Sequence, residues 1–170
     1  MEEDQELKER RALLLWKLGP GDMNRLMSGE NPCPEKTQRA TADSWQNLQQ
    51  MPEKVGLVKM GVPVSAEDME ILRMGHIPAV MEDHWFMYCD DTAIRYYRSW
   101  TGTLIFEAEY CRDGDGYKIT SLKVNLECGD VPWMGPQAAG SLFMCLAAAD
   151  IDADWYRFWE RFVENLEKGE

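Results

Sequence analysis

The chain has 170 residues, of which 45% are hydrophobic and 28% charged, a composition typical of one globular domain with a sizeable core. Lys and Arg number 18 against 30 Asp and Glu, so the formal net charge is −12. Such a surface repels nucleic acids and anionic membranes, which argues against direct nucleic-acid binding. No apolar run approaches the roughly 20 residues of a membrane span. The five cysteines form no C-x-x-C pair, which favours a reducing, cytoplasmic setting.

The N-terminal region, residues 1–50, is predicted to be helical at first and then polar. Residues 2–18 carry leucines at helical spacing, with acids leading and bases following, and Gly19-Pro20-Gly21 stops the helix. A polar stretch over residues 28–50 comes next. Its first half is predicted to be a loop, and residues 41–50 a short helix that carries Trp45 and Leu48.

Residues 55–127 are predicted to form strands with one short helix between them. The apolar, glycine-punctuated residues 55–64 suit a short strand or a buried connection. Ser65 and Asp68 then form a capping box for a helix that ends at Gly75. An antiparallel β-meander follows, from roughly His84 to Glu127.

The meander is predicted to have four strands. Residues 85–89 and 93–97 form a hairpin, and the third strand, residues 103–110, alternates so that Leu104 and Phe106 share one face. Asp113-Gly114-Asp115-Gly116 has the chemistry of a hairpin loop. The apolar parity of the last strand switches at Thr120-Ser121, which predicts a β-bulge there.

Two helices are predicted over residues 138–168. Residues 138–149 are small and apolar, as suits packing against the sheet. The last helix carries an apolar stripe, with Asp152 or Asp154 as its cap: Trp155, Phe158, Trp159, Phe162, Val163 and Leu166. The expected fold is therefore α+β, an antiparallel β-meander packed against N- and C-terminal helices, in a single domain over residues 1–170.

Signatures of metal, nucleotide and hydrolase sites are missing. His76 and His84 are the only histidines and no cysteines are paired, so neither a metal site nor a cofactor is predicted. The aspartates of the hairpin loop do not continue into a calcium-binding loop. The sequence contains no phosphate-binding loop, no dinucleotide fingerprint and no nucleophile elbow.

One cluster of polar residues stands out at the start of the meander. Glu82, Asp83 and His84 lead into its first strand, and Glu82 or Asp83 could form a general acid–base pair with His84. The remaining members lie on or beside the second strand and in the turn after it: Arg95, Arg98, Ser99, Trp100, Thr101 and Gly102.

These residues suit an anion-binding pocket. The guanidinium groups of Arg95 and Arg98 would bind phosphate or carboxylate, Ser99 and Thr101 would donate hydrogen bonds, and Trp100 would offer a stacking face. A structural alternative is that an Arg–Glu pair closes a turn while Trp100 fills the core.

Two strings in this cluster resemble a known pattern. Residues 81–88 read M-E-D-H-W-F-M-Y and residues 95–102 read R-Y-Y-R-S-W-T-G. They resemble the M-E-D-K-W-F-I-Y and H-R-S-W-T-G strings of a family of small bacterial and phage-encoded domains. Some members lie beside, or are fused to, macro-type or other ADP-ribose-processing domains. His84 replaces the usual Lys and Tyr97 the usual His, so the resemblance implies a binding or structural role more than a catalytic one.

Three functions follow as hypotheses. The first is a non-catalytic accessory domain that binds a small anionic ligand, nucleotide or ADP-ribose-like, at the segment 98–102. The second is an acidic protein-interaction or inhibitor module, such as an immunity or anti-defence protein, whose charge contacts a basic partner. The third is a small hydrolase that acts on an ADP-ribose-type substrate through Glu82 or Asp83.

Overall fold

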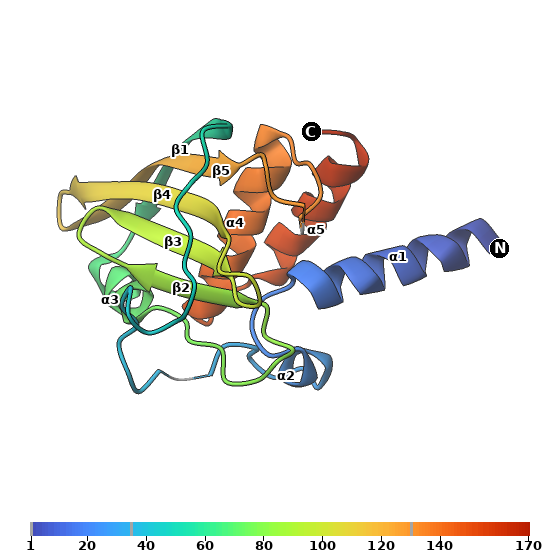
Figure 1. Cartoon of the computed structure of the whole chain (residues 1–170), viewed down its shortest axis with the longest axis horizontal. Coiled ribbons are helices and arrows are strands. Elements are labelled where there is room, and N and C mark those ends of the chain that lie inside the picture. Colours follow the sequence, from blue (N-terminus) through green and yellow to red (C-terminus); the bar gives the residue numbers. More distant parts are fainter. Residues whose placement is uncertain (1, 35, 130) are drawn as a thin grey trace.

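The computed structural model describes residues 2–34, 36–129 and 131–170. Five strands form one antiparallel sheet in the order β1-β5-β4-β3-β2 (Figure 1): β1 Val55–Val64, β2 Trp85–Cys89, β3 Ala93–Arg98, β4 Leu104–Asp113 and β5 Gly116–Asn125. The helices are α1 Glu2–Leu18, α2 Met23–Met27, α3 Ala66–Met74, α4 Pro136–Asp150 and α5 Tyr156–Glu167. β2 to β5 are the predicted meander, and β1 joins it beside β5. The predicted α+β class is confirmed.

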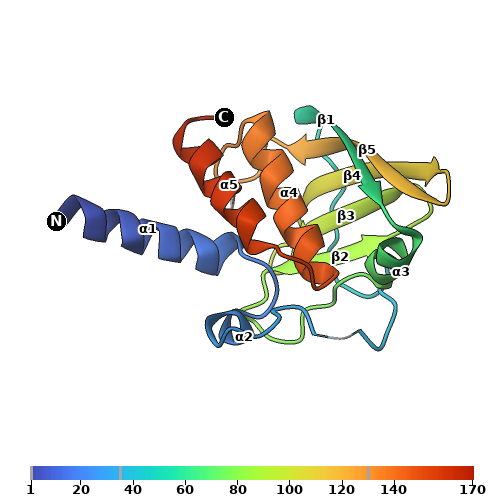
Figure 2. The ribbon, with the colours of Figure 1, turned by 180° about the vertical axis from the view of Figure 1, so that it is seen from behind.

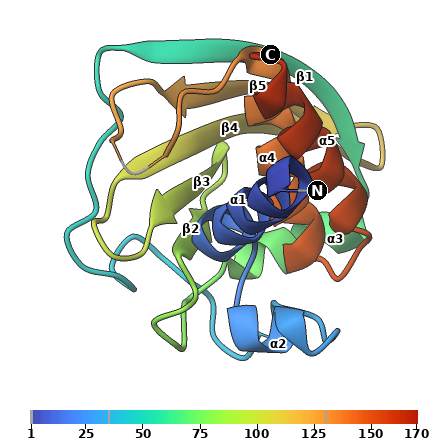
Figure 3. The same ribbon diagram turned by 90° about the vertical axis from the view of Figure 1, so that its right-hand side faces the viewer.

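The two faces of the sheet are covered differently. α4 and α5 lie over one face (Figure 2), while the chain that leads into β1 crosses the other face in extended form (Figure 1). α1 runs outward from the body of the molecule (Figure 1), so Figure 3 shows it nearly end-on, and its last residue, Leu18, meets Trp85 of β2. Arg11 of α1 pairs with Glu167 of α5 at 2.9 Å. Within the described ranges, no helix combines the length and the hydropathy that crossing a membrane requires.

The main core lies between the sheet and the helices. Trp85, Tyr96, Phe106 and Phe143 are among its largest fully buried side chains. All six residues of the stripe predicted for the last helix pack in or against this core, which confirms the stripe. Trp85 also donates from Nε1 to the carbonyl oxygen of Leu18 at 3.0 Å, which fixes the end of α1 on the sheet.

The predicted cap of the last helix is wrong. α5 has Trp155 at its N-cap and no side-chain cap hydrogen bond. Asp152 instead has a positive φ of 56° in the turn between α4 and α5, so its backbone serves the turn. Packing of the stripe, rather than capping, holds this helix in place.

A second, smaller core covers the opposite face of the sheet. Phe86, Tyr97 and Leu104 are buried there, and Trp45 and Leu48 pack against them. The helix predicted over residues 41–50 does not form, because this segment consists of turns and bends. Its polar groups compete with helical hydrogen bonds, as when the Ser44 hydroxyl accepts from the backbone N–H of Thr41 at 2.9 Å.

Among the described residues the sheet has three register shifts. One lies between β1 and β5, and the two that involve β4 set which side chains face which core. Glu109 pairs with Ser121 and Tyr110 with Ile119, so the extra residue is Thr120 and the predicted bulge is confirmed. A second register shift was not predicted. Tyr96 pairs with Phe106 and Tyr97 with Leu104, which leaves Ile105 as an extra residue. Leu104 therefore joins the second core instead of sharing a face with Phe106.

Two local predictions agree with the structure. The Ser65 hydroxyl accepts from the backbone N–H of Asp68 at 3.0 Å at the start of α3, and Gly75 ends the helix with a φ of 77°. Gly114 and Asp115 connect β4 and β5 as a two-residue turn, in which Gly114 has a φ of 60°.

Candidate functional site

The segment 98–102 is the turn between β3 and β4, and its backbone is fixed on both sides. The N–H of Gly102 donates to the carbonyl oxygen of Arg98 at 2.8 Å, and the N–H of Arg98 donates to Thr103 at 2.8 Å. Gly102 has a φ of 75°, and a Cβ there would collide with the carbonyl oxygen of Asn47. Glycine is therefore required at the point where the segment 41–54 crosses the turn.

Ser99 connects this turn to the segment that precedes β2. Its hydroxyl donates to the carbonyl oxygen of Asp83 at 2.8 Å, and its N–H donates to that of His84 at 2.9 Å. Its own carbonyl oxygen accepts from the indole N–H of Trp45 at 2.8 Å. Ser99 is buried, so its hydroxyl orients the turn instead of facing a ligand.

Arg98 joins the turn to the end of α1. Its guanidinium lies 4.6 Å above the ring of Trp85, and Nη2 donates to the carbonyl oxygen of Lys17 at 2.9 Å. A cation at the C-terminus of a helix interacts favourably with the last carbonyl groups and with the helix dipole. Arg98 thus holds the base of α1 and places Lys17 beside the turn.

His84 lies between two tryptophan rings. Its ring centroid is 4.9 Å from that of Trp16 and 5.0 Å from that of Trp100. The imidazole is buried, and among the described residues its nitrogens have no well-formed hydrogen bond beyond a backbone contact with Trp16. Burial, together with the charge of Arg98, lowers the pKa of His84 below its ordinary value, so the ring is neutral at pH 7.

Trp100 is the exposed wall of this site. It is 62% exposed, but its indole N–H donates to the carbonyl oxygen of Met81 at 2.9 Å, which fixes the ring. A pocket of about 210 Å³ lies behind it, with this lining: Trp16, Lys17, His84, Arg98, Trp100 and Thr101. Trp100 also borders a second hollow of about 390 Å³ beside residues 78–81.

The pocket unites residues from distant parts of the chain. Arg98, Trp100, Thr101 and His84 belong to the polar cluster seen in the sequence, whereas Trp16 and Lys17 come from α1 and were not predicted. In the sequence, Lys17 is an ordinary cation in the last turn of a helix. Nothing in its local sequence indicates contact with a turn some eighty residues later. Two cations, a neutral imidazole and two indole rings suit a flat, anionic group.

Arg95 is not part of this pocket. It packs with the second core, where its guanidinium lies 5.6 Å from the ring of Tyr88. It forms ion pairs with Asp90 at 2.5 Å and with Glu107 at 3.0 Å. The structure therefore places Arg95 in an ion-pair network on the face of the sheet opposite to Arg98.

The acids before β2 are separated from His84 as well. Asp83 directs Oδ2 to Nε2 of His76 at 2.5 Å, and its Oδ1 accepts from the backbone N–H of Trp85 at 3.2 Å. No carboxylate among the described residues makes a hydrogen bond to His84. Glu82 is half-buried. The side chains of Asp83 and His84 thus belong to two different sites, although they are neighbours in sequence.

Residues of the two strings 81–88 and 95–102 hold one another in place. Trp85 and Arg98 are partners in the β2–β3 ladder, and Ser99 is bonded to Asp83. The two strings therefore encode one contiguous structural unit around the pocket. Comparison of the whole chain with protein-family models, with curated proteins and with solved structures finds no match.

Proposed function

We propose that this protein binds a small anionic ligand with a flat ring, of the nucleotide or ADP-ribose class, in the pocket between α1 and the β3–β4 turn, without transforming it. Buried His84, whose two ring nitrogens have no well-formed hydrogen bond among the described residues beyond a backbone contact with Trp16, carries this proposal. An unsatisfied buried polar group costs about 1–3 kcal/mol. A ligand that supplies one donor and one acceptor to the neutral ring would remove this cost.

The charge of the pocket supports an anion. Lys17 and Arg98 line it, and no carboxylate is among its lining residues, although the chain has a formal net charge of −12. Arg98 is already positioned by the ring of Trp85 and by the end of α1, so little side-chain entropy is lost when it meets a ligand.

The tryptophans support a ring. Trp100 and Trp16 are 62% and 43% exposed, and base stacking on such an aromatic ring contributes about 1–3 kcal/mol. The pocket volume of about 210 Å³ suits a phosphate or a single ring more than a whole nucleotide. The rest of a larger ligand would extend past Trp100 to the second hollow of about 390 Å³.

The arrangement of the acids favours binding over catalysis. If His84 were a general base, it would need a partner that orients it. The carboxylate of Asp83 does not fill this role, because it is bonded to His76. His84 also contacts the rings of Trp16 and Trp100, which hold its imidazole in place.

Calorimetric titration and thermal shift with ADP-ribose, NAD, AMP and inorganic phosphate test the proposal. We expect at least one of these compounds to raise the melting temperature, and Trp100→Ala to weaken its binding about tenfold or more. Trp133→Ala is the matched control, since Trp133 is 66% exposed and does not line the pocket. Lys17→Gln should weaken binding and reduce its dependence on salt.

The proposal fails if no compound stabilises the chain, or if Trp100→Ala and Lys17→Gln both keep the full affinity. Salt-sensitive co-purification of a basic protein, without any ligand response, would favour the interaction module. Turnover of a nucleotide or ADP-ribosylated substrate that is lost in Glu82→Gln would favour the hydrolase.

A further inference from the structure

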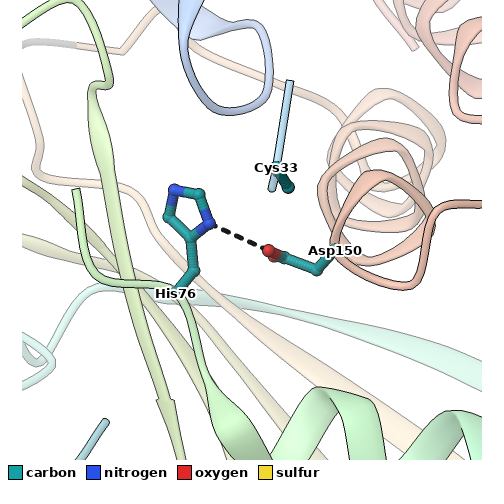
Figure 4. A group of neighbouring side chains, drawn as sticks. All are labelled: Cys33, His76 and Asp150. Atoms are coloured by element: carbon teal, nitrogen blue, oxygen red, sulfur yellow. Dashed lines mark ion pairs between the residues drawn. The ribbon is translucent and has the colours of Figure 1, made fainter. Parts of the chain in front are cut away.

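Three buried side chains meet at a second site, away from the Trp100 pocket. They are Cys33 from the polar N-terminal region, His76 from the segment after α3, and Asp150 at the end of α4 (Figure 4). One sulfur, one ring nitrogen and one carboxylate oxygen lie within 4.8 Å of one another. The three residues are only 4–5% exposed. Potential metal-binding atoms of three chemical types are thus gathered in one enclosed place.

The imidazole of His76 is oriented as in metal sites. Its Nδ1 lies 2.9 Å from Oδ1 of Asp150, and its Nε2 lies 2.5 Å from Oδ2 of Asp83. A histidine that binds a metal almost always donates its other ring N–H to a carboxylate, which fixes the tautomer. Asp83 occupies this position and leaves Nδ1 directed at the cluster.

Asp150 is oriented in the same way. Its Oδ2 accepts from the hydroxyl of Tyr96 at 2.6 Å, while Oδ1 faces His76. The ammonium of Lys36 lies 2.9 Å from Oδ1 and balances part of the negative charge. A carboxylate with one oxygen held by a tyrosine and the other directed at the cluster is prepared to act as a single-oxygen ligand.

We propose that Cys33, His76 and Asp150 form a binding site for a zinc-class transition-metal ion, with the thiolate, Nδ1 and Oδ1 as ligands and Asp83 and Tyr96 as orienting residues. Thiolate, imidazole and carboxylate are the ligand types that Zn²⁺ takes in proteins, and three protein ligands leave a fourth position for water or another group. This proposal is independent of the ligand pocket. It departs from the sequence analysis, which predicts no metal site because the chain has only two histidines and no paired cysteines.

The charges balance when the ion binds. The thiolate of Cys33 and the carboxylate of Asp150 together carry two negative charges, which match the two positive charges of a divalent ion. Lys36 keeps its pairing with Asp150 through a second lone pair of Oδ1. No further buried charge is created.

An entry path is also present. A cavity of about 260 Å³ is lined by His76, Asp83 and Lys36 together with Asp22, and by Pro32 and Pro34 on either side of Cys33. The cavity therefore reaches His76, and the carboxylates of Asp22 and Asp83 in its lining attract a cation.

Titration of the untagged full chain with Co²⁺ tests this proposal, because cobalt reports its ligands by absorption. We expect one-to-one binding with a thiolate-to-cobalt charge-transfer band in the near ultraviolet, and displacement of cobalt by Zn²⁺. Cys33→Ser should abolish the band, and Cys111→Ser, which removes an exposed thiol, should keep it. Trp100→Ala should keep it too, which separates this site from the ligand pocket.

Absence of the band, or its survival in Cys33→Ser, would overturn the proposal. Since Cys33 is buried, a measurement on the unaltered chain guards against a variant that fails to fold. X-ray absorption of the zinc-loaded chain should show one sulfur at about 2.3 Å and nitrogen or oxygen at about 2.0–2.2 Å. A shell without sulfur, or with two or more sulfurs, would also contradict the site.

Discussion

The two histidines of this chain are eight residues apart and both buried, but their surroundings are opposite. His76 has a carboxylate at each ring nitrogen, from Asp83 and Asp150. His84 has an indole ring on each side and, among the described residues, no well-formed hydrogen bond beyond a backbone contact with Trp16. One imidazole is therefore held by charge and the other by aromatic contacts.

The difference shows that burial alone does not set the charge of a histidine. Burial by itself lowers the pKa of His76, but the charges of Asp83 and Asp150 outweigh it and raise that pKa well above its ordinary value. Burial and the nearby Arg98 lower the pKa of His84 by more than the charges of Asp83 and Glu82 raise it. At pH 7 His76 is an imidazolium within an ion network, and His84 is a neutral ring that can still donate and accept a hydrogen bond.

The largest expected effect comes from breaking the network around His76. Asp150→Ala removes the common partner of His76, Lys36 and Tyr96, and loss of one partner from a buried ion pair costs about 3–5 kcal/mol. Urea unfolding in the presence of a chelator measures this loss. Asp154→Ala, at an exposed acid nearby, should change the free energy of unfolding by less than about 0.5 kcal/mol. A loss below about 1 kcal/mol for Asp150→Ala would contradict the buried network.

The second prediction has the opposite sign. His84→Phe keeps the aromatic contacts and removes the unsatisfied nitrogens, so the free energy of unfolding should rise by about 1 kcal/mol. The adjoining pocket of about 210 Å³ gives the larger ring room. The same change at His76 should destabilise the fold, since it leaves Asp83 and Asp150 without their partner. Destabilisation by His84→Phe under the same urea protocol would mean that the His84 nitrogens are satisfied in solution.

The two histidines should also give opposite pH dependences. The folded pKa of His84 is lowered, so near pH 6 the unfolded chain binds more protons, and this contribution falls as the pH drops below about 6.5. The folded pKa of His76 is raised, so its contribution is complete below about 6.5 and is lost as the pH rises toward that pKa. Between pH 5 and 7, the melting temperature of His84→Phe should therefore rise relative to that of the parent chain as the pH falls. Parallel curves would refute the assignment.

The smallest effect on stability is expected for the ion pair between Asp90 and Arg95, on the face of the sheet opposite to Arg98. Burial raises the pKa of Asp90, but the backbone N–H of Thr92 and the side chain of Arg95 lower it to about 2. The stability that this pair contributes is present above about pH 4 and is lost as the pH falls toward 2. Because the Asp90 side chain is 44% exposed, its pair with Arg95 should contribute less than about 1 kcal/mol, measured by a double-mutant cycle of Asp90→Asn and Arg95→Gln. Ligand binding, measured by calorimetry, should stay unchanged, in contrast to Lys17→Gln.

Local signals predicted the elements that surround these sites. The hydroxyl of Ser65 and the freedom of Gly114 act within a few residues, so the start of α3 and the β4–β5 turn follow from sequence. The bulge at Thr120 was predicted for the same reason, because the alternation of apolar residues along the strand shifts by one residue there. The bulge at Ile105 left no such signal, because residues 104–106 are all apolar and all buried, and alternation is invisible in a uniformly apolar run.

The sequence by itself determined the α+β class, the meander and the apolar stripe of α5, because periodicity and turn chemistry operate over short distances. It also marked the cluster around Arg98 and Trp100. Only the tertiary structure decided that Trp16 and Lys17 complete that pocket, that Arg95 lies on the other face, and that Asp83 turns from His84 to His76. Such partners are set by how helix and sheet faces pack, and residues that meet through packing share no spacing along the chain.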